Sequence, residues 1–166
     1  ADIAIVEGCM GLHDGRHGTT DDGSTAQIAK WLGAPVLLVV DAWNLARSAA
    51  AMVHGYATFD PDVRLGAVLF NRVAGVAHAE WIRQAMASVP STAAVAVLGC
   101  VPSDQRLKVG DRLLGLLPPP PALAVSTEPG SCGSGGPHHE RLRALRALMT
   151  AHVDLATLRD LAANAT

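Results

Sequence analysis

The chain has 166 residues, of which 49% are hydrophobic and 17% charged, so it can bury a core without disulfides and is not disordered as a whole. Its 13 basic and 15 acidic residues give a net charge of −2, which excludes a generic basic nucleic-acid binder. No apolar run approaches the roughly 18–20 residues that a membrane-spanning helix needs.

The first quarter of the chain alternates between strand and helix patterns. Residues 2–7 (DIAIVE) form an apolar run typical of a buried parallel strand. Residues 8–23 hold five glycines and predict a loop. Ser24 is expected to cap a helix that ends at Gly33, and residues 35–41 (PVLLVVD) predict a second strand.

The same alternation continues to residue 100. Helices are expected over residues 45–58 and 77–88, and strands over residues 64–71 and 94–100. The order βαβαβαβ with short connections predicts an α/β fold, in which a parallel sheet is covered by helices on both faces.

The remaining residues are less regular. Residues 112–117 are expected to form a small edge strand, and closing helices are expected over residues 138–151 and 155–163. The sequence therefore predicts three parts: a partial α/β domain over 1–117, a Pro/Gly-rich linker or loop over 118–137, and C-terminal helices over 138–166.

Three of the predicted strands end in polar residues: Glu7, Asp41 and Asn71. Open parallel sheets bind ligands where their strands end, so each side chain would point into such a crevice. Glu7 could hold Mg²⁺ or could only cap the following loop, and its position alone does not decide. Asn71, followed by Arg72, could bond a base edge, although spacing alone favours a turn-forming asparagine. Asp41 is more simply explained as a loop or cap carboxylate.

The glycine-rich loop lacks the remaining parts of a phosphate site. Its glycines would let backbone N–H groups approach an anion, but the pattern GxxxxGK[ST] is absent from the sequence. His13 and His17 are not expected to bind zinc, because the residues between them make a poor helix. The three cysteines include no CxxC pair, which predicts a reduced, cytoplasmic chain.

Several segments, in a fixed order, resemble the cobyrinic acid a,c-diamide synthases, which are ATP-dependent, glutamine-using amidases of corrin-ring biosynthesis. These segments are residues 2–15 (DIAIVEGCMGLHDG), 21–32 (DDGSTAQIAKWL), 34–41 (APVLLVVD), 54–65 (HGYATFDPDVRL) and 66–73 (GAVLFNRV). The resemblance implies a parallel-sheet nucleotide-binding domain similar to dethiobiotin synthetase and truncated at its N-terminus.

The resemblance also implies roles for individual residues. Glu7 would be a ligand of Mg²⁺ beside the ATP phosphates, and Asn71 would contact the adenine with Arg72 nearby. Residues of the glycine-rich loop and the following helix would line the carboxylate-substrate side of the crevice: Gly11, Asp22, Ser24 and Thr25. No catalytic residue is assigned.

The reactants implied are a corrinoid, ATP, and glutamine or ammonia. The family's phosphate-binding segment would precede Ala1, and its glutaminase domain would follow Thr166. We therefore expect the 166 residues alone to bind Mg-ATP weakly or not at all, and to form no amide. A nucleotide-dependent switch of the partition-ATPase type and an inert α/β remnant are the alternative functions.

Overall fold

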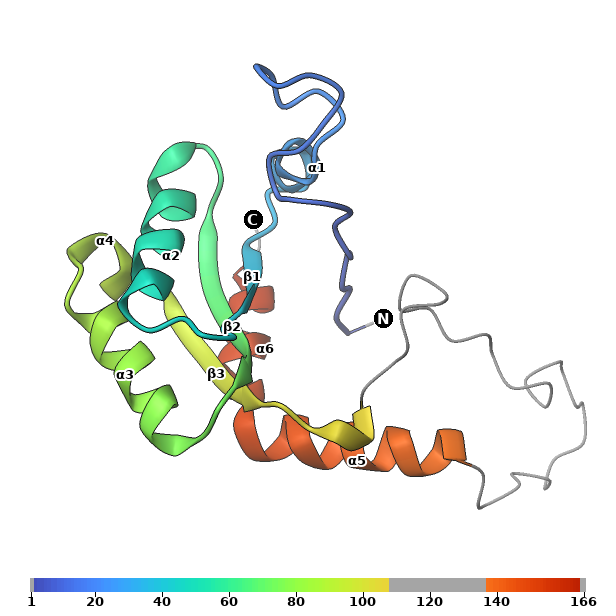
Figure 1. Cartoon of the computed structure of the whole chain (residues 1–166). Coiled ribbons are helices and arrows are strands. Elements are labelled where there is room, and N and C mark those ends of the chain that lie inside the picture. Colours follow the sequence, from blue (N-terminus) through green and yellow to red (C-terminus); the bar gives the residue numbers. More distant parts are fainter. Residues whose placement is uncertain (1, 108–136, 165–166) are drawn as a thin grey trace, which may run out of the picture.

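The computed structural model describes residues 2–107 and 137–164 (Figure 1). In these residues three parallel strands form one sheet in the order β1 (Val36–Asp41), β2 (Leu65–Val73) and β3 (Ala96–Pro102). Helices connect the strands, so the predicted α/β class is confirmed. These strands are continuous apolar runs because helices pack on both faces of the sheet.

One face of the sheet is covered by α2 (Arg47–Phe59), α3 (Val76–Ala87) and α4 (Pro90–Ala93) (Figure 1). The largest core of the chain lies under these helices, and Val53, Phe70 and Ile82 are fully buried in it. Helices α2 and α3 confirm the two predicted helices, whereas the short α4 was not expected.

The other face is covered by α5 (Pro137–His152) and α6 (Leu155–Ala163). Ala67, Leu98 and Val101 of the sheet pack there against Leu148 of α5 and Leu161 of α6. A 3-10 turn, η1 (Gln105–Leu107), follows β3. Both closing helices are confirmed, and Pro137, expected to end the linker, is the first residue of α5.

Helix α1 (Thr25–Leu32) begins at Ser24, whose Oγ accepts a hydrogen bond from Gln27 N at 3.1 Å, and ends at Gly33, which has a φ of 58°. Both predicted ends are therefore confirmed. Leu12 and Ala26 pack against Val63, just before β2. Helix α1 and the glycine-rich loop thus lie at the end of the sheet where the strands begin (Figure 1).

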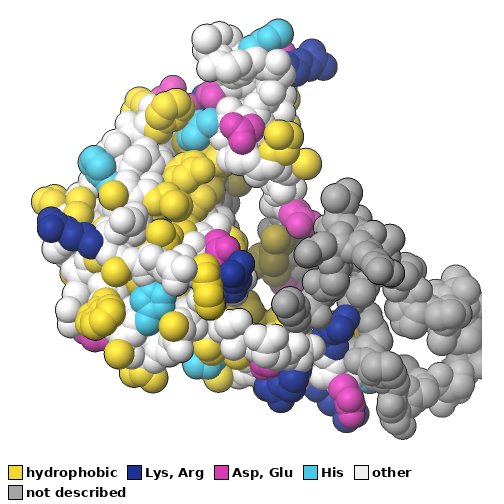
Figure 2. Space-filling view, in the orientation of Figure 1, with side chains coloured by type: hydrophobic (Ala, Val, Ile, Leu, Met, Phe, Trp, Pro, Cys, Tyr) yellow, Lys and Arg dark blue, Asp and Glu magenta, His cyan; other side chains and the backbone are white. Residues whose placement is uncertain are grey.

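The strand predicted over residues 2–7 is wrong. The segment pairs with no strand in the described ranges, and 82% of Ile5 and 64% of Val6 are exposed. An apolar run becomes a strand only where a neighbouring strand satisfies its backbone groups. Within the described residues, β1 pairs only with β2, so its other edge is open, and Val39 is 59% exposed. Hydrophobic side chains accordingly appear on the surface in Figure 2.

The predicted strand at residues 112–117 and most of the predicted linker lie outside the described residues. Among the helices that the structure describes, none has the length and apolar character needed to cross a membrane.

Gly99 of β3 is needed for the contact between the sheet and the α5–α6 junction. A Cβ at this position would lie 2.1 Å from the carbonyl oxygen of His152. The backbone there is fixed, because Asp154 N donates to Leu98 O at 2.8 Å. We expect Gly99→Ala to cost about 1–3 kcal/mol of unfolding free energy through overpacking.

Gly55→Ala is the matched control, because Gly55 lies inside α2 and a Cβ there would have no atom within 4 Å. It is expected to stabilise the chain by up to about 1 kcal/mol. Urea unfolding measures both variants, and equal effects of the two substitutions would contradict the close packing at Gly99.

Candidate functional site

The pairing of β2 with β3 is interrupted at Asn71 and Arg72. Phe70 pairs with Cys100 and Val73 pairs with Pro102, so β2 has one residue more than β3 in this interval. Arg72 has a φ of 61°, in the left-handed region. Such a bulge bends the strand and redirects its side chains. The two residues predicted to bind a base are therefore the ones at which β2 departs from regular pairing with β3, while Asn71 stays paired with Asp41 of β1.

The Arg72 guanidinium lies between a carboxylate and an indole ring. Its Nη1 is 2.9 Å from Asp41 Oδ2, and its central carbon is 5.2 Å from the centre of the Trp43 ring. Asp41 Oδ1 also accepts a hydrogen bond from Trp43 N at 3.1 Å. Asp41, the last residue of β1, thus caps the loop that follows it and pairs with Arg72. The contacts keep a positive charge at the ends of β1 and β2.

Asn71 lies beside Asp41 in the sheet, and its side chain is exposed. Its Oδ1 accepts a hydrogen bond from Arg72 N at 2.9 Å, which supports the bulge. Within the part of the chain that the structure describes, its Nδ2 group makes no hydrogen bond. The amide can therefore still donate one bond and accept another from a ligand.

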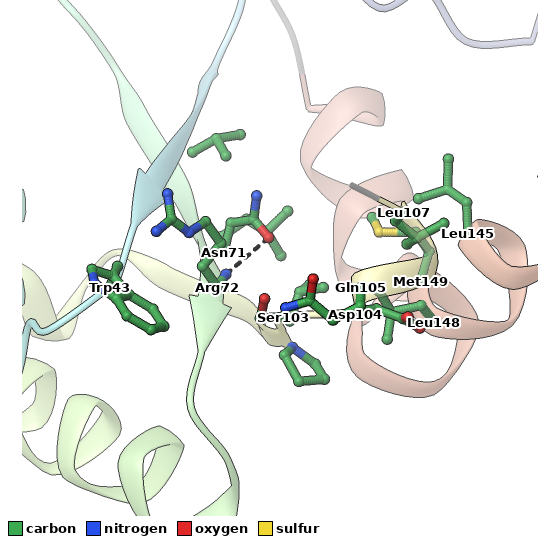
Figure 3. Close-up of a pocket in the computed structure, with 14 residues that line it drawn as sticks. Trp43, Asn71, Arg72, Ser103, Asp104, Gln105, Leu107, Leu145, Leu148 and Met149 are labelled. Atoms are coloured by element: carbon green, nitrogen blue, oxygen red, sulfur yellow. Dashed lines mark hydrogen bonds between the residues drawn. The ribbon is translucent and has the colours of Figure 1, made fainter. Parts of the chain in front are cut away.

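A pocket of about 740 Å³ opens between these strand ends and α5. Asn71 and Arg72 contribute polar groups on one side, and Leu145, Leu148 and Met149 of α5 lie on the other (Figure 3). The size is ordinary for a small-molecule site, and a mostly apolar lining with a few polar groups is typical of one. The arrangement suits a flat heterocycle with hydrogen-bonding edges.

The loop after β3 completes the rim of the pocket with Ser103, Asp104 and Gln105 (Figure 3). Asp104 Oδ2 is 2.6 Å from Arg106 Nη2, and this contact holds the pKa of Asp104 below its usual range. Sequence reasoning missed this rim, the α5 side chains and Trp43. The position of Trp43, two residues after a strand-end acid, was the one available signal.

The other predicted site residues lie together, but at the opposite end of the sheet. Glu7 precedes Gly8, which lies so close to Thr25 that a Cβ on Gly8 would be 2.6 Å from Thr25 Cγ2. Ser24 and Thr25 begin α1, and Gly11 and Asp22 belong to the loop before it (Figure 1). The structure therefore does not bring this group to Asn71 and Arg72.

A second polar cluster holds the glycine-rich loop against the end of α2. Lys30 Nζ lies 2.5 Å from Asp21 Oδ2 and 2.8 Å from Asp60 Oδ2. The ring of His13 packs at 4.7 Å from that of Phe59, and its Nδ1 is 3.6 Å from Asp21 Oδ1. His13, Asp21 and Asp60 are close enough to share a cation, and the Lys30 ammonium already binds both carboxylates.

Lys30→Met is expected to loosen this loop in a pH-dependent way. Hydrogen bonds to Asp21 and then Asp60 raise the pKa of Lys30, and the bond from Lys30 lowers the pKa of Asp60. The Asp60 contribution is therefore present above the pKa of an unfolded aspartate, about 3.9, and is lost as the pH falls through the lower folded value. The Lys30 contribution is lost only at strongly alkaline pH.

Thermal unfolding of wild type and Lys30→Met from pH 3 to 8 tests this expectation. The variant should have the lower Tm at neutral pH, and the difference should shrink toward pH 3. Arg143→Met, which removes an exposed positive charge on α5, should not show this pattern. A Tm difference that stays constant down to pH 3 would show that the ion pairs do not stabilise the fold.

Residues 1–109 match a family model described as an AAA domain. The chain belongs to this AAA-domain family. The three strands, the open edge of β1 and the Asn71–Arg72 bulge all lie within the matched residues. The α/β nucleotide-binding fold predicted from the sequence agrees with this assignment. No solved structure matches the chain.

Similar curated proteins carry the names cobyrinate or hydrogenobyrinate a,c-diamide synthase. The chain is 39% identical to the cobyrinate a,c-diamide synthase of Methanosarcina acetivorans over 99% of its own length and 31% of that protein. It is 49% identical to the hydrogenobyrinate a,c-diamide synthase of Streptomyces coelicolor over 70% of its length and 23% of that protein. The cobyrinate a,c-diamide synthase of Syntrophotalea carbinolica is 50% identical over 70% of the chain and 25% of that protein. The chain thus spans about a third or less of these relatives.

Proposed function

We propose that these residues belong to an ATP-dependent amidase that converts the a and c acetate carboxylates of cobyrinic or hydrogenobyrinic acid to amides. The observation that carries the proposal is the identity of 39% to a cobyrinate a,c-diamide synthase over 99% of the chain. The pocket at Asn71 supports it, because a synthase that uses ATP needs a site for the adenine.

The reaction proposed has two steps. A carboxylate oxygen of the corrinoid attacks the γ-phosphorus of ATP, and ADP leaves, which gives an acyl phosphate. Ammonia, released from glutamine by a separate glutaminase domain, then attacks the acyl carbon. Phosphate leaves, a proton is lost and the amide remains. Positioning and charge neutralisation supply most of the catalysis in phosphoryl transfer.

In this proposal the pocket binds the adenine. The free Nδ2 of Asn71 donates to a ring nitrogen, and its Oδ1 accepts from the exocyclic amine. Arg72 packs on Trp43 at 5.2 Å and adds a flat cationic surface beside the base. The apolar side chains of α5 exclude water from the other side of the ring.

The phosphate side is proposed to come from a segment outside these residues. The sequence lacks GxxxxGK[ST], and the edge of β1 that β2 leaves free would pair with the strand of a phosphate-binding loop. A strand there would also cover Val39, which is exposed in the structure.

Glu7 is proposed as one ligand of Mg²⁺. Its exposed carboxylate is an oxygen donor of the kind that Mg²⁺ prefers. In the described residues Glu7 belongs to no group of metal ligands, and its neighbour Gly8 lies against Thr25 at the opposite end of the sheet from Asn71. The role therefore requires residues 2–7 to move to the strand ends in the whole enzyme, where phosphate oxygens and water would supply the other ligands. Gly11, Asp22, Ser24 and Thr25, which lie in the same part of the chain, are proposed to line the corrinoid carboxylate site.

A chimera tests the proposed reaction. Residues 1–166 would replace the matching segment of the Methanosarcina acetivorans synthase, and mass spectrometry would follow cobyrinic and hydrogenobyrinic acid with ATP and ammonia. We expect ATP-dependent formation of the diamide. Asn71→Leu in the chimera should raise the KM for ATP about tenfold or more and leave the KM for the corrinoid unchanged. A folded chimera that binds ATP but forms no amide with either acid would contradict the proposal.

A further inference from the structure

His78 connects the loop that carries Trp43 to the loop that follows β2, the strand of Arg72. It lies in the first turn of α3, where its Nδ1 accepts a hydrogen bond from Ala74 N at 3.0 Å. Its Nε2 is within hydrogen-bond distance of the carbonyl oxygen of Leu45. Leu45 follows Trp43 in the loop after β1, and Ala74 follows Arg72 in the loop after β2.

The two partners fix the state of the ring. A backbone carbonyl can only accept a hydrogen bond, and a backbone N–H can only donate one. The ring must therefore be neutral, with its proton on Nε2 and a lone pair on Nδ1. An imidazolium would have donors at both nitrogens and would lose the bond to Ala74. The neutral ring thus bridges the two loops, with Nε2 donating to Leu45 O and Nδ1 accepting from Ala74 N.

Few other contacts hold the Trp43 loop beside the end of β2, so the hydrogen bonds of His78 are important for its position. Ala42 N donates to Asn71 O at 2.8 Å, which extends the ladder of the sheet. Beyond that point, the side chains of Arg72 and Asp41 pair while about half exposed. Ion pairs of this kind contribute little, because water competes for both charges. His78 is half-buried, whereas Arg72 and Asp41 are exposed, and its ring binds the Trp43 loop through Leu45.

We infer that His78 is a positioning residue for the base end of the pocket, and the inference rests on the proposed adenine site. His78 is not among the residues that line the pocket, so it would not touch the ligand. It keeps the Trp43 loop next to the bulge, so that Trp43 and Arg72 both line the pocket (Figure 3).

Three substitutions separate the bridge from a local role in α3. Asparagine is short: its Oδ1 can accept from Ala74 N, but its side chain cannot reach Leu45. Glutamine is longer and carries both an acceptor and a donor at its end, so it can serve both partners. Leucine serves neither. If His78 bridges the two loops, His78→Asn and His78→Leu should weaken adenosine binding and His78→Gln should not. If His78 only caps α3 locally, His78→Asn should bind adenosine like wild type.

The experiment is an NMR titration of the full 166-residue chain with adenosine, with backbone and Trp indole signals assigned. We expect His78→Asn and His78→Leu to raise the dissociation constant about five- to tenfold, as the loss of one ordering hydrogen bond would. His78→Gln should bind like wild type. Without ligand, the Trp43 indole N–H should become more mobile in the Asn and Leu variants only.

The outcomes separate the two proposals. If wild type shows no shifts at Asn71 and Trp43, the adenine site itself is wrong. If wild type binds adenosine there and His78→Asn binds equally well, the positioning role is wrong. If His78→Gln is as weak as His78→Asn, the two-ended bridge is wrong.

Discussion

Replacing Phe70 with alanine is expected to remove about 3–5 kcal/mol of unfolding free energy, the usual cost for a fully buried phenylalanine. The side chain is 0% exposed and lies in the core under α2 and α3. The total stability of a domain is about 5–15 kcal/mol, so this loss is a large part of it, and the variant should unfold at a clearly lower urea concentration. Urea unfolding followed by circular dichroism measures the loss.

The chain contains its own control. Its other phenylalanine, Phe59 at the end of α2, is 72% exposed, so Phe59→Ala should cost less than about 1 kcal/mol. Both variants remove the same atoms. Equal losses in Phe70→Ala and Phe59→Ala would show that the core is not placed between the sheet and these helices.

Asn71→Leu is expected to weaken adenosine binding to the chain about tenfold or more, because leucine has the branched shape of asparagine and makes no hydrogen bond. Leucine also loses the acceptor for Arg72 N, which supports the bulge. Asn71→Asp keeps that acceptor, replaces the free donor with a carboxylate oxygen and adds a negative charge beside Asp41. We expect it to weaken binding as well, since the Nδ2 group carries the contact to the ring nitrogen.

NMR titration of the three chains with adenosine gives the dissociation constants, and the Arg72 amide signal reports on the bulge. An Asn71→Asp chain that binds adenosine as well as wild type would show that the Nδ2 group does not recognise the base.

Local patterns were sufficient for most of the fold. Ser24 and Gly33 mark the ends of α1, and the run at 35–41 is a strand, because caps and apolar periodicity act within a few residues. The run at 2–7 has the same pattern and is not a strand in the structure. The difference is the presence of a neighbouring strand, which a local pattern does not contain.

Only the part of the candidate site that lies at the strand ends could be predicted from the sequence. Asn71 and Arg72 were singled out because polar residues at the end of a buried strand lie in a ligand crevice, although spacing alone favoured a turn-forming asparagine and the adenine role came from the family resemblance. Leu145 and Met149 reach the same pocket from α5, more than 70 positions later in the sequence, and their spacing indicates only a helix. The ion pair between Lys30 and Asp60 likewise depends on how α1 packs against the end of α2.

The measurement that tests the account most directly compares Mg-ATP with adenosine in the same titration of residues 1–166. The proposed adenine side of the site lies at Asn71, Arg72 and Trp43, and the sequence holds no GxxxxGK[ST] loop. Both ligands should therefore shift the signals of these residues with similar, weak dissociation constants, about millimolar. A micromolar constant for Mg-ATP, lost on Glu7→Gln, would show that the phosphate and Mg²⁺ side also lies in this chain and would contradict the account.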